Sequence, residues 1–158
     1  MVKINLGCGW RNFDKDWIHI DGGDYDHLDY TDITKLEFEN NSVDLIYASH
    51  VLEYFDINEV KQLLQEWQRV LKPEGILRIA VPDFETMTKL YHEEKITLKD
   101  IIGPLYGRMP MGNKMIYHKT TYDWKSLYNL LYTLEFHDIK RYDWRDYEVH
   151  RQNDDHSQ

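Results

Sequence analysis

The first 21 residues contain a short apolar strand, a Gly-x-Gly turn and a second strand that ends on a carboxylate. The run 2–6 leads into Gly7 and Gly9, and the run 17–20 ends at Asp21. This order is typical of a nucleotide-binding βαβ unit, where glycines let the backbone approach the ligand and the acid binds ribose hydroxyls. A glycine-rich turn between two strands, without a ligand, would give the same sequence pattern. The placement of glycines and acid at strand ends favours an adenosine-containing cofactor.

The connection between these two strands is too short for the helix that a dinucleotide site needs. Only eight residues separate Gly9 from Ile18, and they include the turn-like run 11–15. A bound pyrophosphate normally rests on the N-terminus of a helix that follows the glycines. NAD and FAD would lose that anchor here. S-adenosylmethionine has no phosphate and carries a positive sulfonium, so the missing helix disfavours NAD and FAD but tolerates S-adenosylmethionine.

Length and charge narrow the class of protein. The chain has 158 residues, 42% of them hydrophobic, which suits a single domain over 1–158 with a real core. Acidic residues outnumber basic ones by 28 to 19, and the formal charge is -9. Nucleic-acid binding depends on clustered cations, so we expect no nucleic-acid partner.

The single cysteine, Cys8, excludes an intramolecular disulfide. Without a signal-peptide core or a membrane-spanning run, we expect a cytoplasmic protein with no membrane partner.

Strands and helices alternate along the first half, which predicts a mainly parallel sheet. Residues 43–48 form a short apolar strand, and a capping pattern at 56–59 starts a helix. Pro73 and Gly75 end that helix, and the next strand is predicted over 75–81. The buried face of the helix is predicted to comprise Val60, Leu63, Leu64, Trp67, Val70 and Leu71.

The second half is less regular. Helices are predicted from 84 to about 92 and over 124–134, each after an aspartate cap. Between them, 93–117 is a long connection with several glycines and prolines, which is either a lid over substrate or an ordinary excursion. A late strand is predicted over 139–142, and the tail 145–158 is polar without an obvious element.

Several segments together resemble a known family. They read N-L-G-C-G at 5–9, an acid at Asp21, D-I-T-K-L at 32–36, Y-A-S-H-V-L-E at 47–53, L-K-P-E-G-I-L-R-I-A-V-P-D at 71–83 and H-K-T-T-Y-D at 118–123. This ordered set resembles class I S-adenosylmethionine-dependent methyltransferases, above all the small methyltransferase type 11 proteins, including those predicted near glycan and lipopolysaccharide biosynthesis genes. The resemblance covers about the whole chain. It implies a minimal Rossmann-like α/β fold, with a mainly parallel sheet and reduced helices after the first strands.

The resemblance also implies a set of cofactor-binding residues. The backbone of Gly7, Cys8 and Gly9 would line the methionine and ribose part of S-adenosylmethionine, with Asp21 on the ribose hydroxyls. Cys8 is expected to be a small packed residue rather than a nucleophile, because nothing nearby in sequence would stabilise a thiolate.

Two further groups of residues follow from the same resemblance. Asp32 and Ile33 would flank adenine, with the carboxylate of Asp32 accepting a hydrogen bond from the exocyclic amine. Ala48, Ser49 and His50 would approach the methionine moiety from the end of the fourth strand of the family's fold.

This chain departs from the family pattern in two places. Many relatives carry Glu-His at the end of the strand-four motif, and here the pair is Glu53-Tyr54. The role of that histidine is therefore absent or altered. The full fold also ends in an antiparallel hairpin, whereas only one late strand is predicted here. Either the tail replaces the final edge strand, or the chain is a shortened form whose activity is in doubt.

Methyl transfer is an in-line displacement at the sulfonium, so the protein mainly aligns the acceptor, and a base removes the proton of a hydroxyl or amine. His50 is the first candidate base, although packing at a helix start would explain it almost as well. His118 and Tyr117 are second candidates that would otherwise anchor the long loop. No metal site is expected, because the ligand types near the C-terminus lack a characteristic spacing. They are His150, Asp154, Asp155 and His156.

The sequence thus predicts methyl transfer from S-adenosylmethionine to a small-molecule or glycan-related acceptor, with S-adenosylhomocysteine as the product. A non-catalytic protein that retains the cofactor pocket is the alternative, and a nicotinamide oxidoreductase is a third. The short early connections leave part of one sheet face without covering helices, and parallel sheets are rarely left bare. We therefore expect a homodimer or a C-terminal segment folded over that face, helped by Trp10, Phe13 and Trp17.

Overall fold

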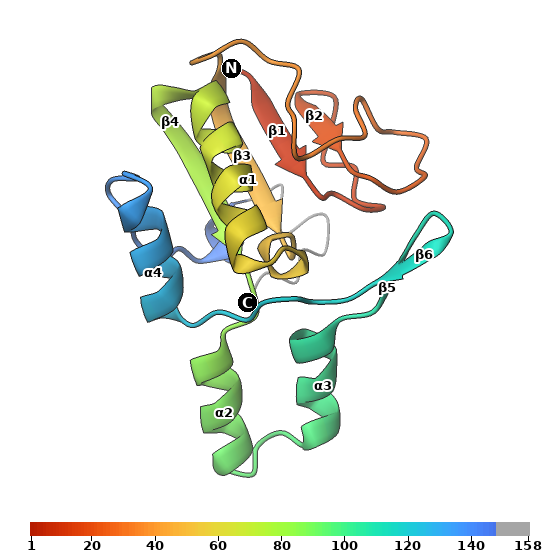
Figure 1. Ribbon diagram of the computed structural model, residues 1–158, viewed down its shortest axis with the longest axis vertical. Coiled ribbons are helices and arrows are strands. Elements are labelled where there is room, and N and C mark those ends of the chain that lie inside the picture. The colour runs from red at the N-terminus through yellow and green to blue at the C-terminus, as the bar shows by residue number, and fades with distance from the viewer. Residues whose placement is uncertain (148–158) are drawn as a thin grey trace.

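A four-stranded parallel sheet forms the centre of the computed structural model, which describes residues 1–147 (Figure 1). The strand order is β2-β1-β3-β4, and all three pairings are parallel. The strands are β1 Lys3–Leu6, β2 Trp17–Ile20, β3 Val43–Ser49 and β4 Leu71–Ala80. Their carboxyl ends lie at one edge of the sheet, where open α/β sheets bind their ligands. The predicted parallel α/β fold is confirmed.

No helix covers the connections on the β2 side of the sheet. Residues 7–42, all of them described, contain β2 but no helix, which confirms the reduced helices predicted for the first strands. β3 and β4 are joined instead through a short 3-10 turn, Leu52–Tyr54, and the helix α1, Ile57–Val70. β4 begins at Leu71 rather than at Gly75, because Leu71 pairs with Val43 across an irregular register.

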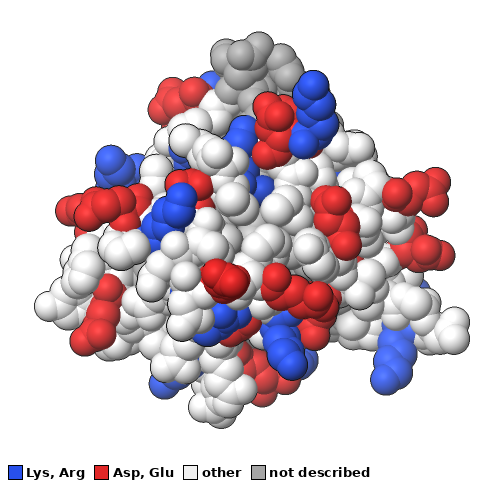
Figure 2. All heavy atoms as spheres, turned by 90° about the horizontal axis from the view of Figure 1, so that it is seen from above, with Lys and Arg blue, Asp and Glu red and all other residues white. Residues whose placement is uncertain are grey.

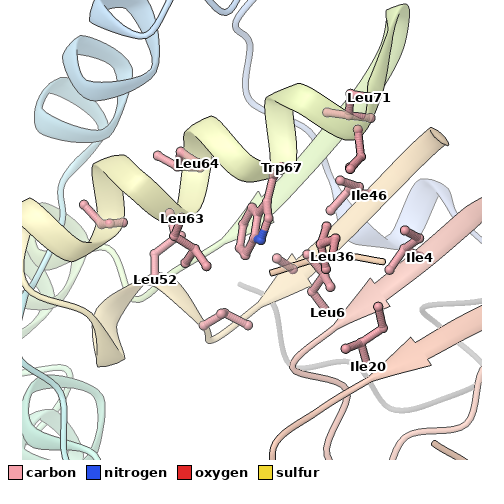
Figure 3. Close-up of a cluster of buried hydrophobic side chains, with 14 of the residues drawn as sticks. Ile4, Leu6, Ile20, Leu36, Ile46, Leu52, Leu63, Leu64, Trp67 and Leu71 are labelled. Carbon is pink, nitrogen blue, oxygen red and sulfur yellow. The ribbon is translucent and has the colours of Figure 1, made fainter. Parts of the chain in front are cut away.

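The helix α1 packs its apolar face on the sheet. Asp56 caps it by accepting hydrogen bonds from the N–H groups of Asn58 and Glu59, at 2.8 and 3.0 Å. Glu59 accepts in return from the N–H of Asp56 at 2.8 Å, which completes a capping box. The buried residues of α1 are Val60, Leu63, Leu64, Trp67 and Val70, as the periodicity predicts. Figure 3 shows several of them above Ile4, Leu6, Ile20 and Ile46 of the strands.

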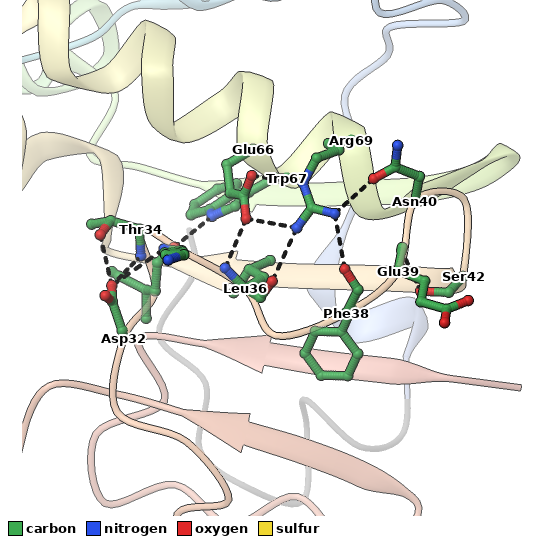
Figure 4. Close-up of polar contacts among 12 residues, drawn as sticks. Asp32, Thr34, Leu36, Phe38, Glu39, Asn40, Ser42, Glu66, Trp67 and Arg69 are labelled. Carbon is green, nitrogen blue, oxygen red and sulfur yellow. Dashed lines mark hydrogen bonds and ion pairs between the residues drawn. The ribbon is translucent and has the colours of Figure 1, made fainter.

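Side chains of α1 hold the helix-free segment 32–42 in place (Figure 4). Arg69 donates to the carbonyl of Leu36 at 3.0 Å, and Glu66 accepts from the N–H of the same residue at 2.8 Å. The indole N–H of Trp67 donates to the carbonyl of Ile33 at 3.0 Å. The Arg69 guanidinium also bonds to Glu66 directly and lowers the pKa of that carboxyl. These bonds satisfy backbone groups that a helix would otherwise have satisfied.

The sheet face opposite α1 carries an aromatic cluster. The ring of Phe13 lies 5.2 Å from Trp17 and 5.5 Å from Tyr47, and all three side chains are buried. Trp10 lies outside this cluster: it is 62% exposed, and its ring lies 5.0 Å from the guanidinium carbon of Arg11. Its part in covering the sheet face stays a prediction. A homodimer is not needed to bury this cluster and stays a prediction.

The segment 93–117 is more ordered than the sequence predicted. After α2, Phe84–His92, it contains α3, Leu98–Tyr106, and a hairpin of β5, Met109–Met111, with β6, Lys114–Ile116. Gly103-Pro104 indicated a break, but a capping box between Thr97 and Asp100 starts α3 and the helix tolerates Pro104 near its end. Gly112 turns the hairpin with a φ of 55°. Figure 1 places α2, α3 and the hairpin beyond the carboxyl edge of the sheet.

The predicted strand over 139–142 was wrong. The helix α4, Trp124–Thr133, forms as expected, but the described residues after it contain only a 3-10 turn, Trp144–Asp146. Arg141 lies 3.5 Å from the carboxylate of Asp83 and 5.1 Å from the ring of Trp124. These contacts join the segment to the starts of α2 and α4, and the ring of Tyr147 lies 3.5 Å from the guanidinium of Arg78 in β4.

Charge is mixed over the surface. On the face in Figure 2, Lys and Arg side chains are scattered among Asp and Glu and do not gather into one stripe. Among residues 1–147, no helix has the length and apolar character needed to cross a membrane.

Leu64→Ala tests the packing of α1. Leu64 is 0% exposed in the core, so truncation leaves a cavity and should lower the free energy of unfolding by about 2 to 5 kcal/mol. Urea denaturation measures the change. Gln65→Ala, at the next and exposed position of α1, is the control and should stay within about 0.5 kcal/mol. Equal midpoints for the two variants would contradict this packing.

Candidate active site

The glycine turn after β1 needs glycine at its first position for two reasons. Gly7 has a φ of 64°, in the left-handed region that side chains disfavour, and a Cβ there would clash with Cγ2 of Val51. Its N–H donates to the carbonyl of Ile20 at 2.8 Å, which fixes the turn against the end of β2. Gly9 follows with a φ of 55°. The turn thus exposes backbone rather than side chains at the sheet edge.

Asp21 joins the ends of β1 and β2. Its side chain is buried, at 5% exposure, and its Oδ2 accepts a hydrogen bond from the N–H of Gly9 at 2.8 Å. Its Oδ1 accepts from the N–H of Gly23 at 2.7 Å. A carboxylate oxygen has more than one lone pair, so both oxygens retain capacity for ligand hydroxyls. The residue is therefore a structural clamp as well as a candidate ligand.

Cys8 is buried between the two glycines, with Sγ 3.7 Å from Nε2 of His27. Burial, reinforced by the charge of Asp21, raises the pKa of the thiol to about 12. Cys8 is thus a neutral thiol at physiological pH and unsuited to act as a nucleophile.

The two adjacent residues expected beside adenine, Asp32 and Ile33, have different surroundings. Asp32 lines a hollow of about 260 Å³ at the end of β2, together with Ile20 and Tyr30. Hydrogen bonds from the hydroxyl and N–H of Thr34 lower the pKa of the Asp32 carboxyl. Ile33 packs against the core and is absent from the lining of this hollow.

The end of β3 brings His50 next to the glycine turn. Ala48 pairs with Leu6 of β1 and is fully buried, and Ser49 pairs with Ala80 of β4. His50 then adopts a φ of 55°, a conformation uncommon outside glycine, and its N–H donates to the carbonyl of Ala80 at 2.9 Å. The next residue, Val51, is the one that touches Gly7. The candidate base therefore lies at the centre of the carboxyl edge.

Glu53 connects both histidine candidates and was not predicted from the sequence. Its side chain is 1% exposed, and its Oε1 lies 3.0 Å from Nδ1 of His50 and 4.0 Å from Nε2 of His118. The three-residue spacing of His50 and Glu53 could have indicated this pair. Burial and the charge of Glu53 raise the pKa of Tyr54, and they raise that of Tyr122 to about 12.

The long excursion returns to the sheet at His118. The Nδ1 of His118 lies 2.9 Å from the carbonyl of Pro104 in α3, and its ring packs edge-on against Tyr54 at 4.6 Å. Tyr117 is 51% exposed just after β6, and no hydrogen bond joins it to His50. At the hairpin tip, Met111 contacts Gly22, next to Asp21. The excursion thus reaches both ends of the candidate site.

No group of three or more potential metal ligands occurs within residues 1–147. The C-terminal ligand types named above, His150, Asp154, Asp155 and His156, lie outside the described residues.

Comparison with known proteins shows which family and which solved structures the chain resembles. Residues 6–79 match the family described as "Methyltransferase domain". A search of curated protein sequences gave no match. Among solved structures, a SAM-dependent methyltransferase from Methanosarcina mazei has a TM-score of 0.57 at 20% identity, over 85% of this chain and 78% of that one. A Burkholderia thailandensis 1,6-didemethyltoxoflavin-N1-methyltransferase with bound S-adenosylhomocysteine has a TM-score of 0.58 at 13% identity, over 88% and 61%.

A third similar structure is a putative methyltransferase of Haloferax volcanii in complex with the Trm112 methyltransferase activator. Its TM-score is 0.52 at 16% identity, over 93% of this chain and 70% of that one. At these identities the structural matches establish the fold.

The parallel sheet, the glycine turn and the acid that ends β2 are features of the class I methyltransferase fold, which this chain shares with the solved structures. Residues 6–79, a little under half of the chain, match the methyltransferase-domain family of type 11, and this match supports a class I S-adenosylmethionine-dependent methyltransferase.

Gly7→Ala should disrupt the turn. The left-handed conformation and the clash with Val51 together should cost about 2 kcal/mol or more of unfolding free energy. Chemical denaturation measures the loss. Gly103→Ala in α3 is the matched control, because a Cβ there meets nothing within 4 Å and alanine favours a helix. If both variants were equally stable, the turn would not require glycine.

Proposed function

We propose that the chain transfers a methyl group from S-adenosylmethionine to a small-molecule or glycan-related acceptor. The observation that carries this proposal is the meeting of Gly7, Asp21 and His50 at one sheet edge, within a methyltransferase domain. In this reading, the backbone of the glycine turn faces the methionine part of the cofactor and Asp21 accepts from the ribose hydroxyls. Asp32 lies beside a hollow of a size to take part of the adenine.

His50 is the proposed general base. Its Nδ1 faces the carboxylate of Glu53, so Nδ1 carries the proton and donates, and Nε2 holds a free lone pair. With 41% of the side chain exposed, that nitrogen can meet an acceptor hydroxyl or amine. When the acceptor attacks the methyl group, the carbon–sulfur bond breaks, its electron pair stays on sulfur, and the acceptor proton passes to Nε2.

Two other functions are separable by experiment. A non-catalytic protein would bind S-adenosylmethionine and S-adenosylhomocysteine without forming product. A nicotinamide oxidoreductase would bind NAD, but the helix-free connection after Gly9 provides no helix N-terminus for a pyrophosphate. Calorimetry with the three ligands distinguishes the last from the others. Formation of S-adenosylhomocysteine with a panel of sugars, nucleotide sugars and small hydroxyl or amine acceptors distinguishes the first two.

Asp21→Ala tests the cofactor site. Lost bonds to the ribose are worth about 1.5 to 3 kcal/mol each, so affinity for S-adenosylhomocysteine should fall about tenfold to a hundredfold. Because Asp21 also accepts from Gly9 and Gly23, the unfolding free energy should fall too, by about 1 to 3 kcal/mol. Calorimetry and urea denaturation measure the two effects. Asp24→Ala, at an exposed position nearby, should change neither. An unchanged dissociation constant for Asp21→Ala would remove this residue from the site.

The hairpin of β5 and β6 is expected to act as a lid. Met111 contacts Gly22 beside Asp21, so bound cofactor should hold the hairpin more firmly against this loop. Hydrogen exchange at 109–116 should slow when S-adenosylhomocysteine is added, and less so in Met111→Ala. Exchange within α1 is the internal reference. Equal rates at 109–116 with and without ligand would argue for an ordinary excursion.

A further inference from the structure

We infer that Glu53 is a positioning residue that orients His50 for proton removal and joins it to the excursion that covers the site. This inference rests on the proposed function of His50. Its physical basis is the cost of burying a carboxylate: at 1% exposure, Glu53 has lost nearly all of its hydration. A side chain that serves only packing would not need this charge.

The bonds of the carboxylate are incomplete without a charged partner. Oε1 faces His50, but Oε2 is buried and has no hydrogen-bond partner among the described residues. The Nε2 of His118 is 4.0 Å from Oε1, beyond hydrogen-bond distance. The carboxylate is therefore under-satisfied while His50 is neutral. It gains an ion pair when His50 takes a proton from the acceptor, so the pair stabilises the product of proton transfer more than its reactant.

The same carboxylate fixes which nitrogen of His50 is free. An ionised carboxylate only accepts hydrogen bonds, so the Nδ1 of His50 must carry the proton and Nε2 must have none. His118 also has its proton on Nδ1, but a different acceptor determines this, the carbonyl of Pro104 at 2.9 Å. The two rings thus have the same tautomer for independent reasons, and His118 is an internal control.

The backbone of Glu53 carries the link to the excursion. Its carbonyl accepts from the N–H of Lys119 at 2.7 Å and of Thr120 at 3.2 Å. The hydroxyl of Thr120 donates to the carbonyl of Phe55 at 2.6 Å. The residues that follow the hairpin are therefore hydrogen-bonded directly to the turn that follows His50. Side-chain substitutions at Glu53 leave these backbone bonds in place, which allows the two roles to be tested separately.

The experiment uses Glu53→Met, which removes the acceptor but keeps an unbranched side chain of similar length in the buried position. Imidazole 15N spectra, recorded where both rings are neutral, report the tautomer of each histidine. In the wild type we expect Nδ1–H for both His50 and His118. In Glu53→Met, His50 should shift toward Nε2–H while His118 stays unchanged. Glu53→Gln, whose amide can still accept but carries no charge, should give a smaller shift and is the second variant if the first does not fold.

The outcomes separate this inference from the proposed function. A His50 signal that keeps Nδ1–H in both variants, or a His118 signal that changes as much as that of His50, would overturn the positioning role. In the Glu53 variants, the dissociation constant for S-adenosylhomocysteine should stay within about twofold of the wild-type value. A wild-type protein that does not bind S-adenosylhomocysteine would instead contradict the cofactor assignment. With an acceptor from the panel, kcat should fall about tenfold or more in Glu53→Met while KM for S-adenosylmethionine is retained. An unchanged kcat would contradict the role in catalysis.

Discussion

The clamp made by Asp21 is the constraint on which the site depends. β1 and β2 are joined without a helix, so hydrogen bonds made by the turn and by Asp21 hold the ends of these paired strands together. The buried carboxylate accepts from the backbone on both sides, from Gly9 and from Gly23, and so holds the glycine turn and the loop after β2 in one geometry. A charged acceptor makes these bonds stronger than neutral ones would be. Asp21 is also the residue proposed to accept bonds from the ribose, so this proposal gives one side chain both a structural and a binding role.

Loss of the usual helices requires other groups to satisfy the backbone. In this chain α1 does so from the opposite side, with Arg69, Glu66 and Trp67 bonded to the segment 32–42. That segment includes Asp32, beside the hollow at the end of β2. The core helix therefore has two functions, burial of the sheet and positioning of a loop near the proposed adenine site. A reduced fold can keep its ligand edge because side chains replace secondary structure.

In the proposed mechanism, the pairing of His50 with Glu53 takes the place of the second histidine of many relatives. The residue after Glu53 is Tyr54, which has no imidazole. Its ring packs against His118. His118 follows the far end of the excursion, 65 residues after Glu53 in the sequence. An imidazole near the buried carboxylate is thus present, but a distant segment supplies it.

Much of the fold and part of the site follow from sequence alone. The alternation of strands with α1, the apolar face around Trp67, the glycine turn and the acid at Asp21 are local patterns, because strand and helix periods and left-handed turns depend on neighbours along the chain. Only the tertiary structure decided the rest. Burial of Glu53 between His50 and His118, the hairpin that reaches Gly22, and the docking of Arg141 where a strand was expected all join distant segments. Contacts of this kind depend on how elements pack, and no local period encodes them.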